Sequence, residues 1–187
     1  MKNEQEKLIN FDVIGIEELS VTHGYKIGNA FPVHFHTTYN LGIIEQGERE
    51  FTYRGKKTVI KRDDIFIIQP FEPHSCKSIN NSEHSYKIVS MHLDNNFYFP
   101  QLVIHNSDLL SLVREFHALA EYEKTSDRLK YLYKEIIKLL KTFAIGCRVE
   151  RLDLDVTLRI KAAKEYIENN CHLELSLKEM ADIACFS

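Results

Sequence analysis

The sequence predicts an α+β protein in which a small β-barrel precedes a helical region. Short β-type runs such as LGIIEQGERE and EFTYRGKKTVI alternate with turn-forming residues between about residues 20 and 104. After Pro100 the repeat of apolar residues lengthens from two to about 3.6, which is the helical period. Near the end, Ser176 and Glu179 have the S-x-x-E spacing of a capping box, which predicts the start of another helix.

Composition and charge exclude several classes of protein. The chain has 187 residues, of which 44% are hydrophobic and 27% charged, as in an ordinary globular protein. Its net charge of -3 predicts no general attraction to nucleic acid, so any DNA binding must be local or lie outside this chain. The N-terminus is charged and no apolar run approaches membrane-spanning length, so we expect a cytoplasmic protein without a membrane contact. The cysteines form no C-x-x-C pair and predict neither a disulfide scaffold nor a zinc knuckle: Cys76, Cys147, Cys171 and Cys185.

The β-rich part of the chain is expected to follow a charged N-terminal arm. Residues 1–19 predict the arm, and residues 20–104 predict the barrel. Within the barrel, residues 53–56 (YRGK) predict a hairpin turn and residues 61–64 (KRDD) a second polar reversal. Several short strands at this spacing indicate a sandwich or a small barrel.

The helical part is expected in two segments. In residues 105–150, Asn106 or Ser107 can cap a first helix, and a second should follow Thr125 or Ser126. Apolar residues at helical spacing define one face of each helix: Leu109, Leu112, Val113, Phe116 and Ala120, then Leu129, Leu132, Ile136 and Leu139 or Leu140. The second stripe is either a dimer interface or part of the chain's own core. In residues 151–187, Asp155 is the expected N-cap of a third helix, followed by the capped fourth helix.

Three histidines of the barrel form a candidate binding site. His34 and His36 are two residues apart and project from the same face of a strand, which Asn40 shares. His74 follows a later strand, so the three imidazoles can converge as a ligand set for zinc, nickel, iron or manganese. Alternatively they line a polar pocket for an organic effector. The candidate ligand-binding residues are His34, His36, Tyr39, Asn40, Tyr53 and His74.

These residues resemble the two motifs of the cupin family. The pattern H-x-H-x3-E-x6-G is matched by His34, His36, Asn40 and Gly47, and a second motif ending in P-x-x-P-H is matched by Pro70, Pro73 and His74. The resemblance implies a double-stranded β-helix barrel. Asn40 departs from the pattern because metal-dependent cupins carry a glutamate there, and an amide is a neutral and weaker ligand. We therefore expect no catalytic residue and no cofactor, with a divalent metal on His34, His36 and His74 as the alternative.

The order of elements resembles that of AraC-type transcription regulators over nearly the whole chain. A cupin-like barrel, two helices and a capped helix pair ending in LSLKEMADIACFS follow one another. The resemblance implies that the barrel binds a small-molecule effector and supports a homodimer, while helix-turn-helix units bind DNA. Residues 151–187 then correspond to the start of the first unit, so the chain is expected to be truncated and to hold no DNA-binding residue, with DNA contacted beyond Ser187.

Two other classes of function stay open at this point. A metal-dependent cupin enzyme would use the three-histidine site for chemistry, and a cupin-like module could bind a ligand without any DNA contact. The capped C-terminal helix pair favours the regulator over the enzyme, and Asn40 favours it too. The effector, the sign of regulation and the DNA site are not encoded in any pattern of this sequence.

Overall fold

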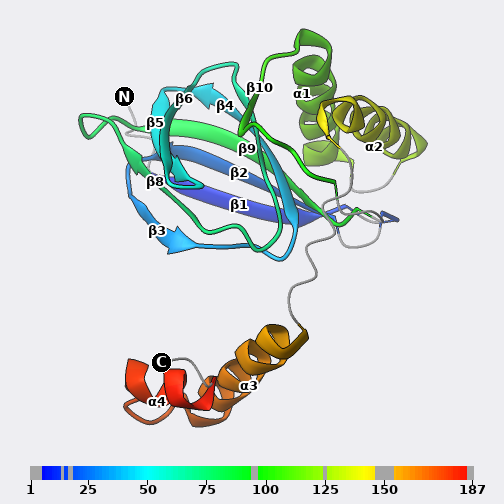
Figure 1. The fold of residues 1–187 in the computed structure, drawn as a ribbon. Coiled ribbons are helices and arrows are strands. Elements are labelled where there is room, and N and C mark those ends of the chain that lie inside the picture. Colours follow the sequence, from blue (N-terminus) through cyan, green and yellow to red (C-terminus); the bar gives the residue numbers. More distant parts are fainter. Residues whose placement is uncertain are drawn as a thin grey trace. The chain divides into compact units, whose positions relative to one another are not determined.

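The computed structural model describes residues 6–13, 15–16, 19–93, 97–123, 126–145 and 154–184. The chain divides into two compact units, residues 1–147 and 148–187 (Figure 1). The first unit contains the strands and two helices, and the second contains a helix pair. The predicted α+β class is confirmed. Within the described ranges, no helix is long and apolar enough to cross a membrane.

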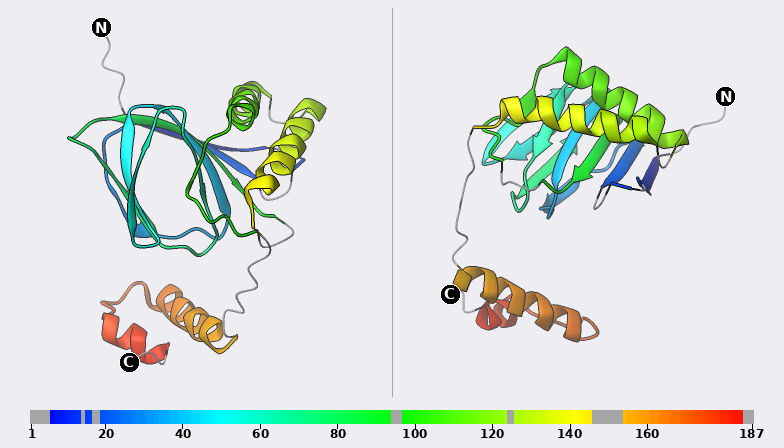
Figure 2. Two further views of the ribbon diagram at one scale, coloured as in Figure 1. Left: turned by 45° about the horizontal axis from the view of Figure 1, so that its top comes forward. Right: turned by 90° about the vertical axis from the view of Figure 1, so that its right-hand side faces the viewer.

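The described strands form two antiparallel sheets. One sheet has the order β1 (Lys7–Asp12), β2 (Ser20–Ile27), β9 (His84–Met91), β4 (Tyr39–Gln46), β7 (Ile65–Ile68) and β10 (Val103–Ile104). The other has the order β3 (Phe31–His34), β8 (His74–Ser78), β5 (Glu48–Tyr53) and β6 (Lys56–Lys61). Figures 1 and 2 show the sheets facing each other, so that they enclose the interior of a small barrel. The predicted hairpin lies between β5 and β6, where Arg54 and Gly55 both have positive φ.

Alternation along the six-stranded sheet separates two apolar cores. On β4, Leu41 and Ile43 face a core shared with the helices, whereas Ile44 faces the barrel interior. The interior core also contains Phe51 and Phe66. Figure 2 shows α1 (Ser107–Tyr122) and α2 (Asp127–Leu140) covering the outer face of this sheet. The two helices therefore belong to the same packed unit as the barrel.

The two helices begin where the sequence places them. The side chain of Asn106 accepts a hydrogen bond from the Leu109 N–H at 2.7 Å, and Ser126 accepts one from the Leu129 N–H at 3.1 Å. A short 3-10 helix, Lys141–Phe143, follows α2. The apolar stripe of α2 is buried in the core shared with the sheet: Leu129, Leu132, Ile136 and Leu140. Of the two alternatives for this stripe, the structure supports part of the chain's own core.

Part of the predicted N-terminal arm is a strand. β1 pairs with β2 from Lys7 opposite Tyr25 to Asp12 opposite Ser20. Backbone hydrogen bonds to a neighbouring strand hold this edge segment, and such pairing leaves no strong apolar pattern in the sequence. The expected N-terminal arm of residues 1–19 thus contains a strand at Lys7–Asp12, and residues 1–5 lie outside the described part.

The second unit contains α3 (Leu154–Asn170) and α4 (Leu177–Ile183). The predicted capping box is confirmed, because the Ser176 hydroxyl accepts from the Glu179 N–H at 3.2 Å and the Glu179 carboxylate accepts from the Ser176 N–H at 2.8 Å. Asp155 lies inside α3 and is not its N-cap. Cys76 and Cys171 are free thiols. Cys147, Cys185 and Ser187, on which expectations were also based, lie outside the described residues.

Two buried histidines join the six-stranded sheet to α1. His23 Nε2 on β2 lies 3.0 Å from His117 Nδ1 on α1, and both side chains are buried. Burial lowers the pKa of His23, with Lys87 acting in the same direction and Glu121 and Glu45 acting against it. Burial, followed by His23 and Lys87, lowers the pKa of His117 well below 6.5. Protonation of this pair would place charge in the sheet-helix core, so the folded state favours the neutral form.

Stability is expected to fall with acidity below about pH 6.5. A histidine whose pKa is lower in the folded than in the unfolded chain has no effect on the pH dependence of stability above its unfolded-state pKa. Below that pKa, each such histidine lowers the free energy of unfolding by about 1.4 kcal/mol per pH unit. Replacement His117→Gln removes one such group, so the slope of unfolding free energy against pH should flatten by about 1 kcal/mol per unit. Urea unfolding between about pH 7 and about pH 5 measures the slope. The exposed His172, changed to Gln, is the control that should leave it unchanged.

Candidate functional site

The barrel interior contains a cavity of about 230 Å³. Its wall is largely apolar, with Ile44, Phe51, Phe66 and Ile68 among the residues that line it. Polar side chains are added by His34, His36, Asn40, His74, Cys76, His84 and Ser90, together with residues of β1 and β2. Ligand pockets are concave, mostly apolar and carry a few convergent polar groups. The cavity has this character, and its volume suits a small molecule.

The three predicted histidines converge in this cavity. Their candidate ligand atoms all lie within 4.8 Å of one another. His34 ends β3 and pairs directly with His74 at the start of β8, which brings their ring centroids to 4.3 Å. His36 follows β3 and lies 4.9 Å from His34 and 5.0 Å from His74 between centroids. The strand register therefore brings together residues that are forty positions apart in the sequence.

Backbone contacts fix the orientation of two of these rings. His34 Nδ1 lies 2.7 Å from the Pro32 carbonyl oxygen, and His74 Nδ1 lies 3.0 Å from that of Glu72. Since a carbonyl oxygen only accepts, both Nδ1 atoms carry the proton and both Nε2 atoms keep a lone pair. Metal-bound histidines commonly show this arrangement. The same lone pairs can equally accept hydrogen bonds from the hydroxyl or amine of an organic ligand.

The electrostatic environment favours the neutral form of His36 and His74. Burial, followed by the neighbouring His74 and His34, lowers the pKa of His36 to about 4. Burial also lowers the pKa of His74, although its hydrogen bond to the Glu72 carbonyl acts in the opposite direction. A neutral imidazole is both a metal ligand and a hydrogen-bonding group. His36 and His74 are therefore ready to bind at neutral pH without first losing a proton.

Asn40 completes the predicted cluster but brings no charge. It lies on β4, is 3% exposed and lines the cavity. Its Oδ1 atom accepts a hydrogen bond from the Thr38 hydroxyl at 3.0 Å. The three neutral nitrogens fit a divalent metal in number and spacing, but Asn40 supplies no carboxylate to balance the charge of the ion. The donor set thus fits an imidazole-binding metal less well than a site with a glutamate would.

Tyr39 and Tyr53 do not line the cavity, which corrects their prediction as ligand-binding residues. Tyr39 neighbours Asn40 on β4 and so faces the opposite side of the sheet, where its hydroxyl donates to the Phe97 carbonyl at 2.8 Å. Tyr53 is buried near the edge of the barrel, and its hydroxyl accepts from Gln69 Nε2 at 3.3 Å. Burial raises its pKa.

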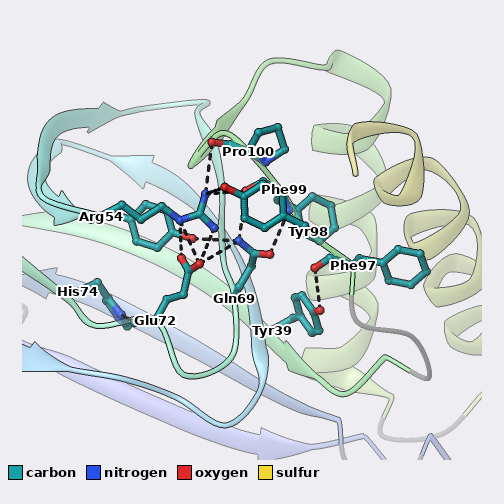
Figure 3. A network of polar contacts seen from close by, with 10 residues as sticks. Tyr39, Arg54, Gln69, Glu72, His74, Phe97, Tyr98, Phe99 and Pro100 are labelled. Atoms are coloured by element: carbon teal, nitrogen blue, oxygen red, sulfur yellow. Dashed lines mark hydrogen bonds and ion pairs between the residues drawn. The ribbon is translucent and has the colours of Figure 1, made fainter. Parts of the chain in front are cut away.

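A polar network behind His74 was not predicted (Figure 3). Arg54 forms a two-pronged ion pair with Glu72, with Nε donating to Oε2 at 2.8 Å and Nη2 to Oε1 at 2.6 Å. The same guanidinium donates through Nη1 to the Phe99 carbonyl at 3.0 Å. Gln69 fixes the Phe99 backbone as well, accepting from its N–H at 3.0 Å and donating to its carbonyl at 3.2 Å. The sequence did contain a signal for this network, because Gln69 and Glu72 lie in the QPFEPH segment of the second motif.

The network joins the histidine site to the segment that leads into the helices. Glu72 holds His74 through its backbone carbonyl, and Arg54 joins the Glu72 carboxylate to Phe99. Residues 97–102 then lead into β10 and α1. Polar contacts therefore connect the loop that carries His74 to Phe99, in the segment of chain that leads to β10 and α1 (Figure 3).

Solved cupin structures have a similar barrel. A cupin superfamily protein from Desulfitobacterium hafniense is 11% identical, with a TM-score of 0.40 over 49% of this chain and 83% of its own. An RmlC-like cupin family protein with a double-stranded β-helix fold, from Methanocaldococcus jannaschii, is 18% identical, with a TM-score of 0.39 over 48% of this chain and 84% of its own.

Sequence comparison gives the family. A curated relative from Bacillus subtilis (strain 168), described as the uncharacterized HTH-type transcriptional regulator YbfI, is 22% identical over 174 residues, which is 84% of this chain. The chain spans 62% of the length of that relative. The family described as the AraC-like ligand binding domain matches residues 18–131, which contain β2 to β10, α1 and the start of α2. The chain therefore belongs to the AraC-like ligand-binding domain family.

Proposed function

We propose that this chain is the effector-sensing part of a cytoplasmic AraC-type transcription regulator and not an enzyme. A small molecule binds in the barrel, and its binding controls the geometry of a homodimer and thereby DNA binding by a C-terminal helix-turn-helix domain. The observation that carries the proposal is the barrel cavity, whose wall combines apolar residues with the convergent His34, His36, His74 and Asn40. Family membership and the regulator relative support it.

The contacts of the barrel suggest how an effector would act on the helices. A ligand can shift a conformational equilibrium only through different affinities for the two states. A molecule that contacts His74 also bears on the Glu72 loop, which Arg54 connects to Phe99. In the proposed mechanism the ligand favours one arrangement of this network, and residues 97–102 pass the change to α1. Coupling energies between two such sites are typically about 1–3 kcal/mol.

The chain of 187 residues is expected not to bind operator DNA on its own. Its net charge of -3 predicts no general attraction to the phosphate backbone of DNA. In a gel-shift assay with promoter fragments, we expect no complex at physiological salt. The matched sample is a chain extended through the complete helix-turn-helix region, whose DNA affinity should change when an effector is added. Specific, salt-dependent binding by the 187-residue chain would contradict the proposal.

The second candidate function is a metal-dependent cupin enzyme that uses His34, His36 and His74. Three histidine nitrogens within 4.8 Å of one another favour it. A divalent ion on these residues would supply Lewis acidity, and the chain's own groups would hold the ion through the Nε2 atoms of His34 and His74. None of the described residues lining the cavity is an aspartate or glutamate that could act as a general acid or base. The regulator is therefore the better supported function.

Introducing a carboxylate at Asn40 tests how the cavity treats metal. We expect Asn40→Glu to raise the affinity for Zn²⁺ at least about tenfold, because the new ligand adds both a bond and a compensating charge. Asn40→Gln is the matched control, because glutamine has the size of glutamate but no charge. Chelator competition measures the affinity. Equal affinities for the wild type and the glutamate variant would mean that the missing carboxylate is not what weakens this site.

A further inference from the structure

Arg49 is a buried cation without a carboxylate partner. It lies on β5 and is 0% exposed. Its guanidinium donates to the Ile27 carbonyl at 3.4 Å and to the Asn29 carbonyl, and its Nε atom has no hydrogen-bond partner. Within the described ranges, no acidic side chain forms an ion pair with it. Buried arginines are normally paired, because an uncompensated charge in the interior is unfavourable.

His84 adds to the surplus of donors around this guanidinium. Arg49 Nη1 lies 2.9 Å from His84 Nδ1, which itself lies 2.7 Å from the Ile27 carbonyl oxygen. If Nδ1 carries the proton, it donates to Ile27, and only the more distant Nε2, at 3.4 Å, can accept from Arg49. If Nδ1 is unprotonated, its contact with the Ile27 carbonyl joins two acceptors. In either case the Nε–H of Arg49 has no acceptor, and an acceptor with a negative charge would complete this cluster.

The cluster lies against the wall of the barrel cavity. The guanidinium contacts His84 and sits over the Phe31 ring at 5.2 Å from its centroid, and both residues line the cavity. Cys76, a third lining residue with a small side chain, interacts with Arg49, which itself does not line the cavity. A group that enters between Cys76 and His84 would therefore meet the guanidinium.

Strand register places this cluster at the opposite end of the cavity from the three histidines. On β8, His74 pairs with His34, Cys76 pairs with Phe31 and Phe51, and Ser78 pairs with Arg49. His74 and Ser78, the partner of Arg49, are four residues apart on β8, which corresponds to about 13 Å along the strand. Between them lie Phe31, Phe51 and Cys76, which line the cavity. The cavity thus has the three histidines at one end and His84, backed by the positive charge of Arg49, at the other.

We propose that the effector is a small organic monocarboxylate whose carboxylate is bound by Arg49 at the His84 end of the cavity. The inference rests on the proposed function, because it names the ligand class of the same barrel. A carboxylate offers two acceptor oxygens to a guanidinium and matches its single charge, whereas a phosphate brings more charge than one arginine compensates. The apolar middle receives the body of the molecule, and the histidines receive any polar group at its far end.

The Arg49 Nε–H resonance provides a direct test. Its signal in a ¹H–¹⁵N NMR spectrum, assigned by its loss in Arg49→Lys, is followed while hexanoate or benzoate is added to the 187-residue chain. Hexanamide and benzamide are the uncharged counterparts, and inorganic phosphate is the third probe. We expect a saturable shift with a carboxylate and an affinity at least about tenfold weaker for its amide. The comparison uses the wild-type chain alone, so it does not depend on a variant that folds.

The variants and the remaining outcomes separate this inference from the proposed function. Arg49→Met should lose the preference for carboxylate over amide, whereas Arg62→Gln, at an exposed site, should keep it. Equal binding of acid and amide, with shifts at the His36 ring, would overturn the monocarboxylate while leaving a small-molecule cavity. Tighter binding of phosphate than of either acid would also overturn it. A lack of any shift at both Arg49 and the histidines would count against the carboxylate and against the proposed cavity function together.

Discussion

Replacing Gly47 with alanine is expected to destabilise the first unit by about 3–5 kcal/mol. Gly47 joins β4 to β5 with φ at +76°, a conformation that costs a non-glycine residue about 1–2 kcal/mol. A Cβ atom at this position would also lie 2.4 Å from the Glu83 carbonyl oxygen, which is backbone and cannot simply turn away. The strands on both sides would have to move, and β4 carries Asn40 of the candidate site.

Gly55 offers a matched control for this prediction. Its φ is +71°, but nothing lies within 4 Å of the position that a Cβ atom would occupy. Gly55→Ala therefore reports the backbone cost alone, about 1–2 kcal/mol. Chemical denaturation of both variants measures the difference. Similar losses for the two would mean that the close approach of the Glu83 carbonyl has little energetic weight.

Neutralising Glu72 is expected to cost about 2–4 kcal/mol and to loosen the loop that carries His74. Glu72→Gln leaves the Arg54 guanidinium without its counter-charge, and the side chains are only 25% and 19% exposed for Arg54 and Glu72, respectively. Hydrogen exchange at the Phe99 amide, which is held in the same network, should become faster. Urea unfolding and hydrogen-exchange measurements on the same sample report the two effects.

Glu50→Gln is the control for the loss of an ion pair. Glu50 lies 3.5 Å from Lys57 Nζ and 3.3 Å from Lys77 Nζ, and both lysine side chains are exposed, at 66% and 59%. Surface pairs contribute little, so this variant should leave stability nearly unchanged. If Glu72→Gln were as mild as Glu50→Gln, the Arg54 network would have no role in holding the loop, and the proposed route from His74 to α1 would lose its support.

Much of the fold could be predicted because its signals are local. Asn106, Ser126 and Ser176 cap helices through their own side chains, and the capping box needs only the four residues that form it. The hairpin at residues 53–56 depends on two adjacent residues with positive φ. The convergence of His34, His36 and His74 followed from a motif whose spacing already encodes a known barrel.

What the sequence did not predict depends on contacts between distant residues. Tyr39 was placed in the pocket by its chemistry, although its position next to Asn40 puts it on the other face of β4. Arg54 and Glu72 are eighteen positions apart and meet only once β5 and β8 pair. Arg49 is an ordinary charged residue in the sequence, and only its burial at 0% exposure reveals the missing partner. Pairing and burial of this kind are properties of the assembled barrel.

The most direct test of the account is a crystallographic fragment screen of the 187-residue chain. The central claim is that the barrel cavity binds a small organic effector. It predicts that bound fragments gather inside the barrel, between the histidine cluster of His34, His36 and His74 and the opposite end at His84. Fragments confined to the outer surface, with a stoichiometric metal ion on the three histidines instead, would contradict the claim and favour the enzyme.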